Sequence, residues 1–114
     1  MTTLGTCNYD NLFAGSAEVV TGSVIAGAEL TRGTVVGLVT ETGKAVAVDS
    51  TAVDGSKDPY GIIAEDVEAD KPVAVYLTGE FNEDALTFGG ADTADTHRRA
   101  LRDIGIFLKI NIKA

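Results

Sequence analysis

Short apolar runs, mostly alternating or rich in β-branched residues, predict a chain built mainly of β-strands. Glycine, proline or acidic residues separate these runs, as is typical of turns between strands. The expected strands are residues 18–25, 34–40, 44–48, 62–63 and 73–77. The second and third of them are expected to form a hairpin, because Gly43 between them adopts positive φ without steric cost.

The strand at residues 73–77 is expected to be the central one. Alternate side chains of a strand point to opposite faces, and both faces are mostly apolar here. One face carries Val73, Val75 and Leu77, and the other carries Ala74 and Tyr76. Because such a strand is typically covered on both sides, we place it in the middle of the fold. Residues 79–82 are then expected to close a bend.

One good helix is predicted near the C-terminus, from a cap at Asp92 or Thr93 to about Ile104. Gly105 stands where a helix commonly ends. The side chains expected to face inward are Ala94, His97, Leu101 and Ile104. A shorter helix capped by Asn82 is expected before it.

The last strand is predicted over residues 106–112, where alternation is clearest. Its apolar face consists of Ile106, Leu108, Ile110 and Ile112. Lys109 and Asn111 indicate that the other face is at least partly in water.

Residues 1–16 follow neither a helical nor a strand period. Apart from Met1, the large apolar residues of this arm are Leu4, Tyr9, Leu12 and Phe13. Two interpretations stay open from the residues alone: simple terminal disorder, or a segment that becomes ordered on a partner. We therefore divide the chain into an arm, residues 1–16, and a single β-rich domain, residues 17–114.

Composition and charge exclude several classes of partner. The chain has 114 residues, is 45% hydrophobic and carries a net charge of −8. Such an acidic chain is repelled by nucleic acid and by anionic membrane surfaces, so neither is an expected partner. No secretory signal and no membrane-spanning run is expected. Cys7 is the single cysteine, so it has no internal disulfide partner; we interpret it as incidental rather than as a reactive thiol.

No motif points to catalysis, a metal or a cofactor. Gly37 to Gly43 followed by Lys44 has the wrong spacing for a phosphate-binding loop, and Ala45 replaces the hydroxyl residue of that motif. His97 is the only histidine, and its place on the inward face of the helix indicates a structural role. With one cysteine and one histidine, no zinc site is expected.

Carboxylates form two runs, but their positions favour solvated turns over acid–base or calcium chemistry. The first run is Glu65, Asp66, Glu68 and Asp70, and the second is Glu80, Glu83 and Asp84. We therefore expect no catalytic centre in these runs.

The order of several segments resembles the head decoration proteins of lambda-like tailed bacteriophages. The strongest part is Val75-Tyr76-Leu77-Thr78-Gly79-Glu80-Phe81-Asn82. The other segments are residues 30–37, 49–52, 54–56, 59–66, 85–88 and 97–102. The resemblance covers roughly residue 30 to the C-terminus and matches the arm less well.

This resemblance implies a mainly β fold with short helices (α+β), of the β-clip kind, assembled as a homotrimer. It implies a cement protein that binds the major capsid protein on the outer surface of the expanded head and resists the pressure of packaged DNA. The protein would be found in the host cytoplasm during assembly and then in the virion. The arm residues Leu4, Tyr9, Leu12 and Phe13 become the candidate capsid contacts.

Two other classes remain as alternatives. One is a small-molecule or glycan binding module with a pocket between subunits, and the other is an enzyme that uses the carboxylate runs. A ligand pocket lined by Glu80 or Asp66 would favour either of them over the cement protein.

Overall fold

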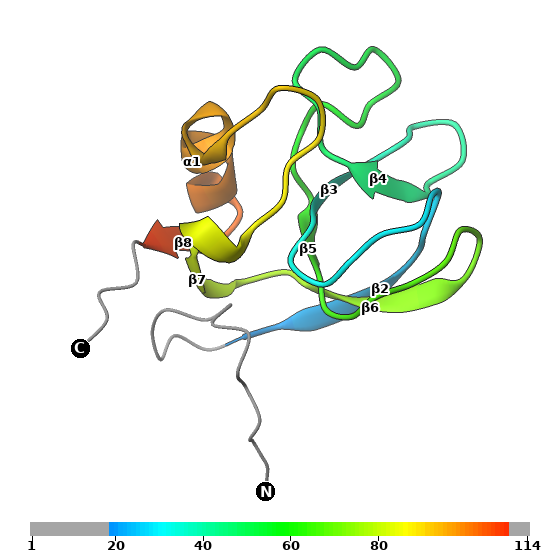
Figure 1. The fold of residues 1–114 in the computed structure, drawn as a ribbon, viewed down its shortest axis with the longest axis horizontal. Helices are drawn as coiled ribbons and strands as arrows, with labels where there is room; N and C mark the ends of the chain where they lie inside the picture. The colour runs from blue at the N-terminus through cyan, green and yellow to red at the C-terminus, as the bar shows by residue number, and fades with distance from the viewer. Residues whose placement is uncertain (1–18, 110–114) are drawn as a thin grey trace, which may run out of the picture.

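The computed structural model describes residues 19–109 and has the β-rich architecture that the apolar pattern predicts (Figure 1). The strands are β2 (Thr21–Ile25), β3 (Val35–Leu38), β4 (Ala45–Ala47), β5 (Gly61–Ile63), β6 (Pro72–Tyr76), β7 (Gly79–Asn82) and β8 (Ile106–Lys109). A 3₁₀ helix η1 (Glu83–Ala85) and the helix α1 (Ala94–Asp103) lie between β7 and β8 in sequence. None of the helices in this part of the chain is long and apolar enough to cross a bilayer.

Five strands form one antiparallel sheet in the order β2-β6-β5-β3-β4. The two edge strands approach each other at Ala26 and Ala45, which form a bridge, and the Gly27 N–H donates to the Ala45 carbonyl at 2.7 Å. The sheet is therefore curled nearly into a barrel. The predicted hairpin is confirmed: β3 and β4 pair antiparallel, and Gly43 in their turn has φ 72°.

Buried apolar residues form two clusters, one on each face of the curled sheet. The first, enclosed by the five strands, consists of Val24, Ala26, Leu30, Val36, Ala45, Ile63, Val73 and Val75. The second, between the sheet and α1 with β7 and β8, consists of Val35, Val48, Ile62, Phe81, Leu101 and Ile106. Neighbours in sequence on β3 and β5 enter different clusters, as the two-residue period of a strand requires.

The prediction that residues 73–77 form the central strand is wrong in position but correct in its faces. β6 is second from an edge, and β5 is the middle strand. Val73 and Val75 of β6 enter the first cluster, while Tyr76 packs against the second. Burial on both faces therefore does not place a strand at the centre, because the curled sheet also covers strands near its edges.

Residues 79–82 were expected to close a bend, but they form β7, which pairs in parallel with β8. A parallel pair needs a long crossover, and η1 and α1 supply it. The sequence does not indicate this strand because it begins with a glycine, which usually marks a turn. Gly79 is required here because its φ of 146° is a glycine conformation and a Cβ would lie 2.9 Å from the Phe81 ring. The expected cap is confirmed: the Asp84 N–H donates to Asn82 Oδ1 at 3.2 Å and begins η1.

Helix α1 begins after Thr93 and ends before Gly105, whose φ is 94°, as the sequence predicts. His97 and Leu101 are buried, which confirms two members of the inward stripe. Ile104 is 40% exposed, so its assignment to that stripe is wrong. Ile104 caps the helix with φ −103° and ψ 8°, and the helical period no longer sets its direction.

Strand β8 confirms the predicted alternation as far as Lys109: Ile106 is fully buried, Leu108 is partly buried, and Lys109 is exposed. Ile110, Asn111 and Ile112 lie outside the described residues.

Candidate functional site

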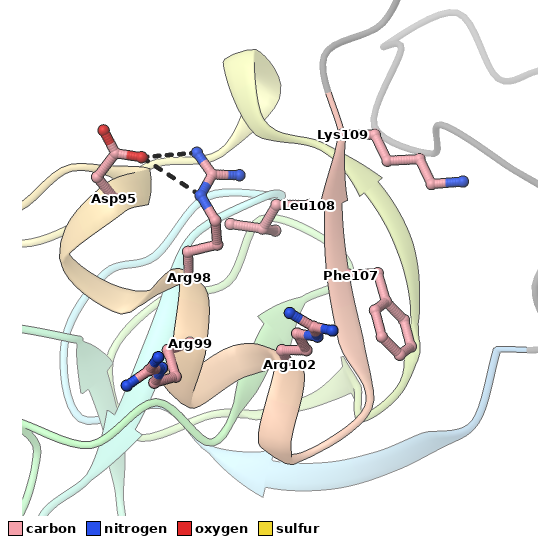
Figure 2. A pocket seen from close by; sticks show the side chains of 7 residues that line it. All are labelled: Asp95, Arg98, Arg99, Arg102, Phe107, Leu108 and Lys109. Atoms are coloured by element: carbon pink, nitrogen blue, oxygen red, sulfur yellow. Dashed lines mark hydrogen bonds and ion pairs between the residues drawn. The ribbon is translucent and has the colours of Figure 1, made fainter.

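A surface hollow of about 630 Å³ lies between α1 and β8 (Figure 2). We call it the helix–strand face, and its lining residues are Asp95, Arg98, Arg99, Arg102, Phe107, Leu108 and Lys109. It gathers four of the nine lysines and arginines of an acidic chain. This concentration of cations makes it the candidate interaction site.

The spacing of residues on the two elements explains why these side chains meet. On α1, the charged residues at positions 95, 98, 99 and 102 repeat at intervals of three and four, which places them on one side of the helix. The opposite side carries His97 and Leu101 and packs inward. On β8, alternation turns Phe107 outward, where it is 43% exposed, between the inward Ile106 and Leu108.

Arg98 is held by two carboxylates at one end of the face. Its Nη1 lies 2.8 Å from Glu83 Oε1, and its Nη2 lies 2.7 Å from Asp95 Oδ1 (Figure 2 shows the second pair). These bonds, first to Glu83 and then to Asp95, raise the pKa of the guanidinium above its already high value. Lys109 is paired in the same way with Glu80, at 3.1 Å. Both cations are therefore largely neutralised by their own chain.

Arg99 and Arg102 differ from these two cations. Both are exposed, and within residues 19–109 neither forms an ion pair. Figure 2 shows Arg102 reaching from α1 toward the part of β8 that carries Phe107. Arg99 lies on the side of α1 away from β8, so of the two only Arg102 lies between the helix and the strand that carries Phe107 (Figure 2). An unneutralised guanidinium can bind a carboxylate or another anion.

A buried polar cluster fixes α1 against the rest of the domain. His97 Nε2 lies 2.7 Å from Asp92 Oδ2, and the side chains are only 4% and 6% exposed. The Ser50 N–H and Oγ each donate to the Asp92 carboxylate at 2.7 Å. Hydrogen bonds from His97, then from Ser50, lower the pKa of Asp92. The His97 ring also stacks on Phe88, with centroids 5.8 Å apart. The predicted structural role of His97 agrees with this burial and bonding.

The carboxylates of the two runs lie mostly in separate ion pairs or hydrogen bonds. Asp70 lies 2.8 Å from Lys44 Nζ, and this contact lowers the pKa of Asp70. The Arg32 N–H donates to Asp66 at 2.9 Å. Glu80 and Glu83 pair with cations of the helix–strand face. In the part of the chain that is described, no group of three metal-ligating side chains comes together.

Asp66 lines a smaller hollow of about 320 Å³ with Glu29 and Glu68. This hollow has the carboxylates that a binding module or hydrolase of the alternative classes would use. Its charged residues Glu29, Asp66 and Glu68 are all exposed, however, so nothing excludes water from them. The arrangement gives no carboxylate the buried environment that commonly tunes a catalytic acid.

The candidate capsid contacts Leu4, Tyr9, Leu12 and Phe13 lie outside the described residues, as does Cys7. Hydrogen bonds hold Val20, near the start of the described residues, against the turn that precedes β7. The Val20 N–H donates to Thr78 Oγ1 at 3.1 Å, and the Leu77 N–H donates to the Val20 carbonyl at 2.6 Å. The following Gly79 N–H donates to Gly105, immediately before β8. The segment that leads from residues 1–18 therefore enters the domain beside the β7–β8 pair.

Sequence reasoning missed the helix–strand face, although its components were visible. From the sequence, Arg98, Arg99 and Arg102 are expected only to lie toward the C-terminal end of the helix, where cations interact favourably with its dipole. The spacing opposite the inward stripe was sufficient to place them on one outer side. The proximity of Phe107 was not visible, because it depends on how the crossover packs α1 against β8.

A family model described as bacteriophage lambda head decoration protein D matches residues 1–106. No protein with a curated description matches the chain. The family match spans the curled sheet, β7, η1, α1 and the first residue of β8. It includes residues 1–18 and ends before Phe107, Leu108 and Lys109 of the helix–strand face.

Proposed function

The chain belongs to the bacteriophage lambda head decoration protein D family, and we propose that it acts as a trimeric cement on the outer surface of the expanded phage head. Family membership gives it a structural role in the capsid. The observation that carries the proposal is the match itself, which covers residues 1–106 of the 114-residue chain. In the proposed role, the trimer holds neighbouring capsid subunits together against the pressure of packaged DNA.

Exposed apolar side chains support a trimer. The larger ones are Val20, Ile25, Val53, Tyr60, Ile104 and Phe107, each at least 37% exposed. Val53 is fully exposed in the loop between β4 and β5. A stable interface of standard size between two subunits buries about 1,600 Å² in total. Apolar groups spread over several elements are available to contribute to such contacts.

Residues 1–16 are proposed as the arm that binds the major capsid protein. Ordering an extended segment costs about 1–2 kcal/mol per residue of backbone, and four large apolar side chains in the arm are too few to offset this alone. An exposed sheet edge on the capsid protein would satisfy the backbone of the arm by strand addition. Leu4, Tyr9, Leu12 and Phe13 would then fill pockets beside the added strand.

A truncated protein that begins at Ala17 tests this assignment. It should keep the thermal midpoint and the oligomeric mass of the full chain, because both buried clusters lie at Val24 and beyond. Its affinity for expanded shells should fall at least about tenfold, which corresponds to about 1.4 kcal/mol. Co-sedimentation with expanded shells measures the affinity, and light scattering measures the mass of the free protein.

The full-length protein, prepared in the same way, is the control. Unchanged shell affinity after truncation would show that the folded domain makes the contacts by itself. A monomeric mass both at high concentration and on the shell would contradict the trimer.

A further inference from the structure

We propose that the helix–strand face is a second contact with the shell, and that it binds an acidic segment of the capsid protein that carries an apolar side chain. The proposal rests on the proposed function, because it assumes that the protein binds the shell. It assigns to Arg99, Arg102 and Phe107 a role that is separate from the arm.

The local distribution of charge supports binding of an acidic segment at this face. The chain has 17 acidic residues against nine lysines and arginines. Several of these cations are engaged within the domain: Arg98 with Glu83, Lys109 with Glu80 and Lys44 with Asp70. Arg32 is also engaged, since its Nη1 donates to the Ala64 carbonyl at 2.7 Å and to Tyr76 Oη at 2.9 Å.

Arg99 and Arg102 are left as two exposed guanidiniums one helical turn apart. Each can donate two parallel hydrogen bonds to a carboxylate.

The exposed Phe107 ring indicates a ligand that has an apolar part as well as a negative charge. It stands on the same hollow, and 43% of its surface remains exposed although it directly follows the fully buried Ile106. An aromatic ring on the same hollow as Arg102 favours a segment that presents an apolar group as well as a carboxylate. The hollow of about 630 Å³ is the size of sites that take a few side chains.

The surroundings of the two arginines disfavour nucleic acid. Asp95 and Asp103 also lie on α1, Glu83 lies close to Arg98, and the whole chain carries −8. A phosphate backbone needs a series of cations, and here two are available among many carboxylates.

The position of the face points to the shell as the source of the acidic segment. Residues 1–18 enter the domain at Val19, beside Gly79, and Gly79 pairs with Ile106 immediately before Phe107. The arm of the proposed function therefore starts beside the strand pair that carries Phe107. A second contact next to the arm adds affinity without further loss of overall rotational freedom, since the first contact has already been made.

A charge-reversal pair with a matched control tests the proposal. The variant Arg99→Glu/Arg102→Glu is compared with Lys57→Glu/Lys71→Glu, which makes the same change of charge at two exposed lysines elsewhere. Binding to expanded shells is measured by co-sedimentation at about 50 mM and about 200 mM salt, because screening weakens exposed ion pairs. The thermal midpoint of the lysine control should equal that of the wild type, since both lysines are exposed. The arginine variant should melt slightly lower, because its two acidic side chains lie toward the negative C-terminal end of α1.

The Arg99→Glu/Arg102→Glu variant should bind at least about tenfold more weakly at low salt, and its affinity should depend less on salt than that of the wild type. The lysine control should bind within about twofold of the wild type. Phe107→Ala should weaken binding while leaving the salt dependence unchanged, because it removes only apolar contact.

Three outcomes would overturn the inference. If the wild type binds shells and the arginine variant binds as the lysine control does, the face is not a contact, although the cement function survives. If the arginine variant changes the mass of the free protein by light scattering, the face joins copies of this chain. Binding of duplex DNA that the arginine variant alone loses would assign the face to nucleic acid. Failure of the wild type itself to bind shells would instead reject the proposed function.

Discussion

Replacing Leu101 by alanine tests how α1 is held in place. Leu101 is fully buried among Phe81, Ile106 and the outer face of the sheet. Burial of a leucine side chain contributes about 1.5–3 kcal/mol, and the cavity left by its removal raises the usual cost to about 2–5 kcal/mol. Because its neighbours are themselves fixed on paired strands, the cavity cannot collapse easily. We expect a loss of about 3–5 kcal/mol in the free energy of unfolding.

Ile104→Ala is the matched control, because a simple helical period places both residues on the inward stripe. Ile104 is 40% exposed, so its truncation should cost about 1 kcal/mol or less. The chain has no tryptophan, so urea unfolding is best followed by far-ultraviolet circular dichroism. Protein concentration must be equal in all samples, since oligomers gain stability by mass action. Equal losses for the two variants would refute the packing of α1 described above.

Two further predictions concern residues that contact the loop between β4 and β5, namely Asp92 before α1 and Gly37 in β3. The pKa of Asp92 is lowered from 3.8, mainly by His97 and then by Ser50. The stability that the carboxylate contributes is therefore fully present above pH 3.8, and it is lost as the pH falls through the lowered pKa of the folded state. Asp92→Asn should lower stability at pH 7 and reduce the further loss on acidification to about pH 3, as shown by urea midpoints at both pH values; an unchanged pH dependence would contradict it. Gly37→Ala should cost about 1–3 kcal/mol in the same urea assay, because its Cβ would press on the Ser56 carbonyl and lie 2.8 Å from that of Asp58; a wild-type midpoint would contradict this contact.

The local features of the fold could be predicted from the sequence because neighbouring residues determine them. The β3–β4 hairpin needs only two apolar runs and Gly43, and the ends of α1 need only Thr93 and Gly105. The alternation in β6 and β8 likewise assigns side chains to faces without knowledge of the partner strands.

The arrangement of the strands could not be predicted in the same way. The order β2-β6-β5-β3-β4 and the Ala26–Ala45 bridge depend on pairings between distant residues. β7 was missed because Gly79 suggests a bend and because its partner β8 lies more than twenty residues later. The direction of Ile104 depends on the backbone at the end of α1, where the helical period stops.

The helix–strand face was partly predictable. The spacing of Arg98, Arg99 and Arg102 places them on one side of α1, opposite Leu101. Which arginines are neutralised depends on Glu83, which lies fifteen residues before Arg98 and reaches it only in the folded chain. The unneutralised pair Arg99 and Arg102 therefore becomes evident only from the structure.

Binding of the full-length protein to expanded and to unexpanded shells of its phage tests the central claim most directly. Quantitative co-sedimentation gives both the affinity and the number of copies bound at saturation. A trimeric cement should bind expanded shells saturably, in numbers divisible by three, and should bind unexpanded shells at least about tenfold more weakly. No binding to expanded shells, or equal binding to both kinds of shell, would contradict the account.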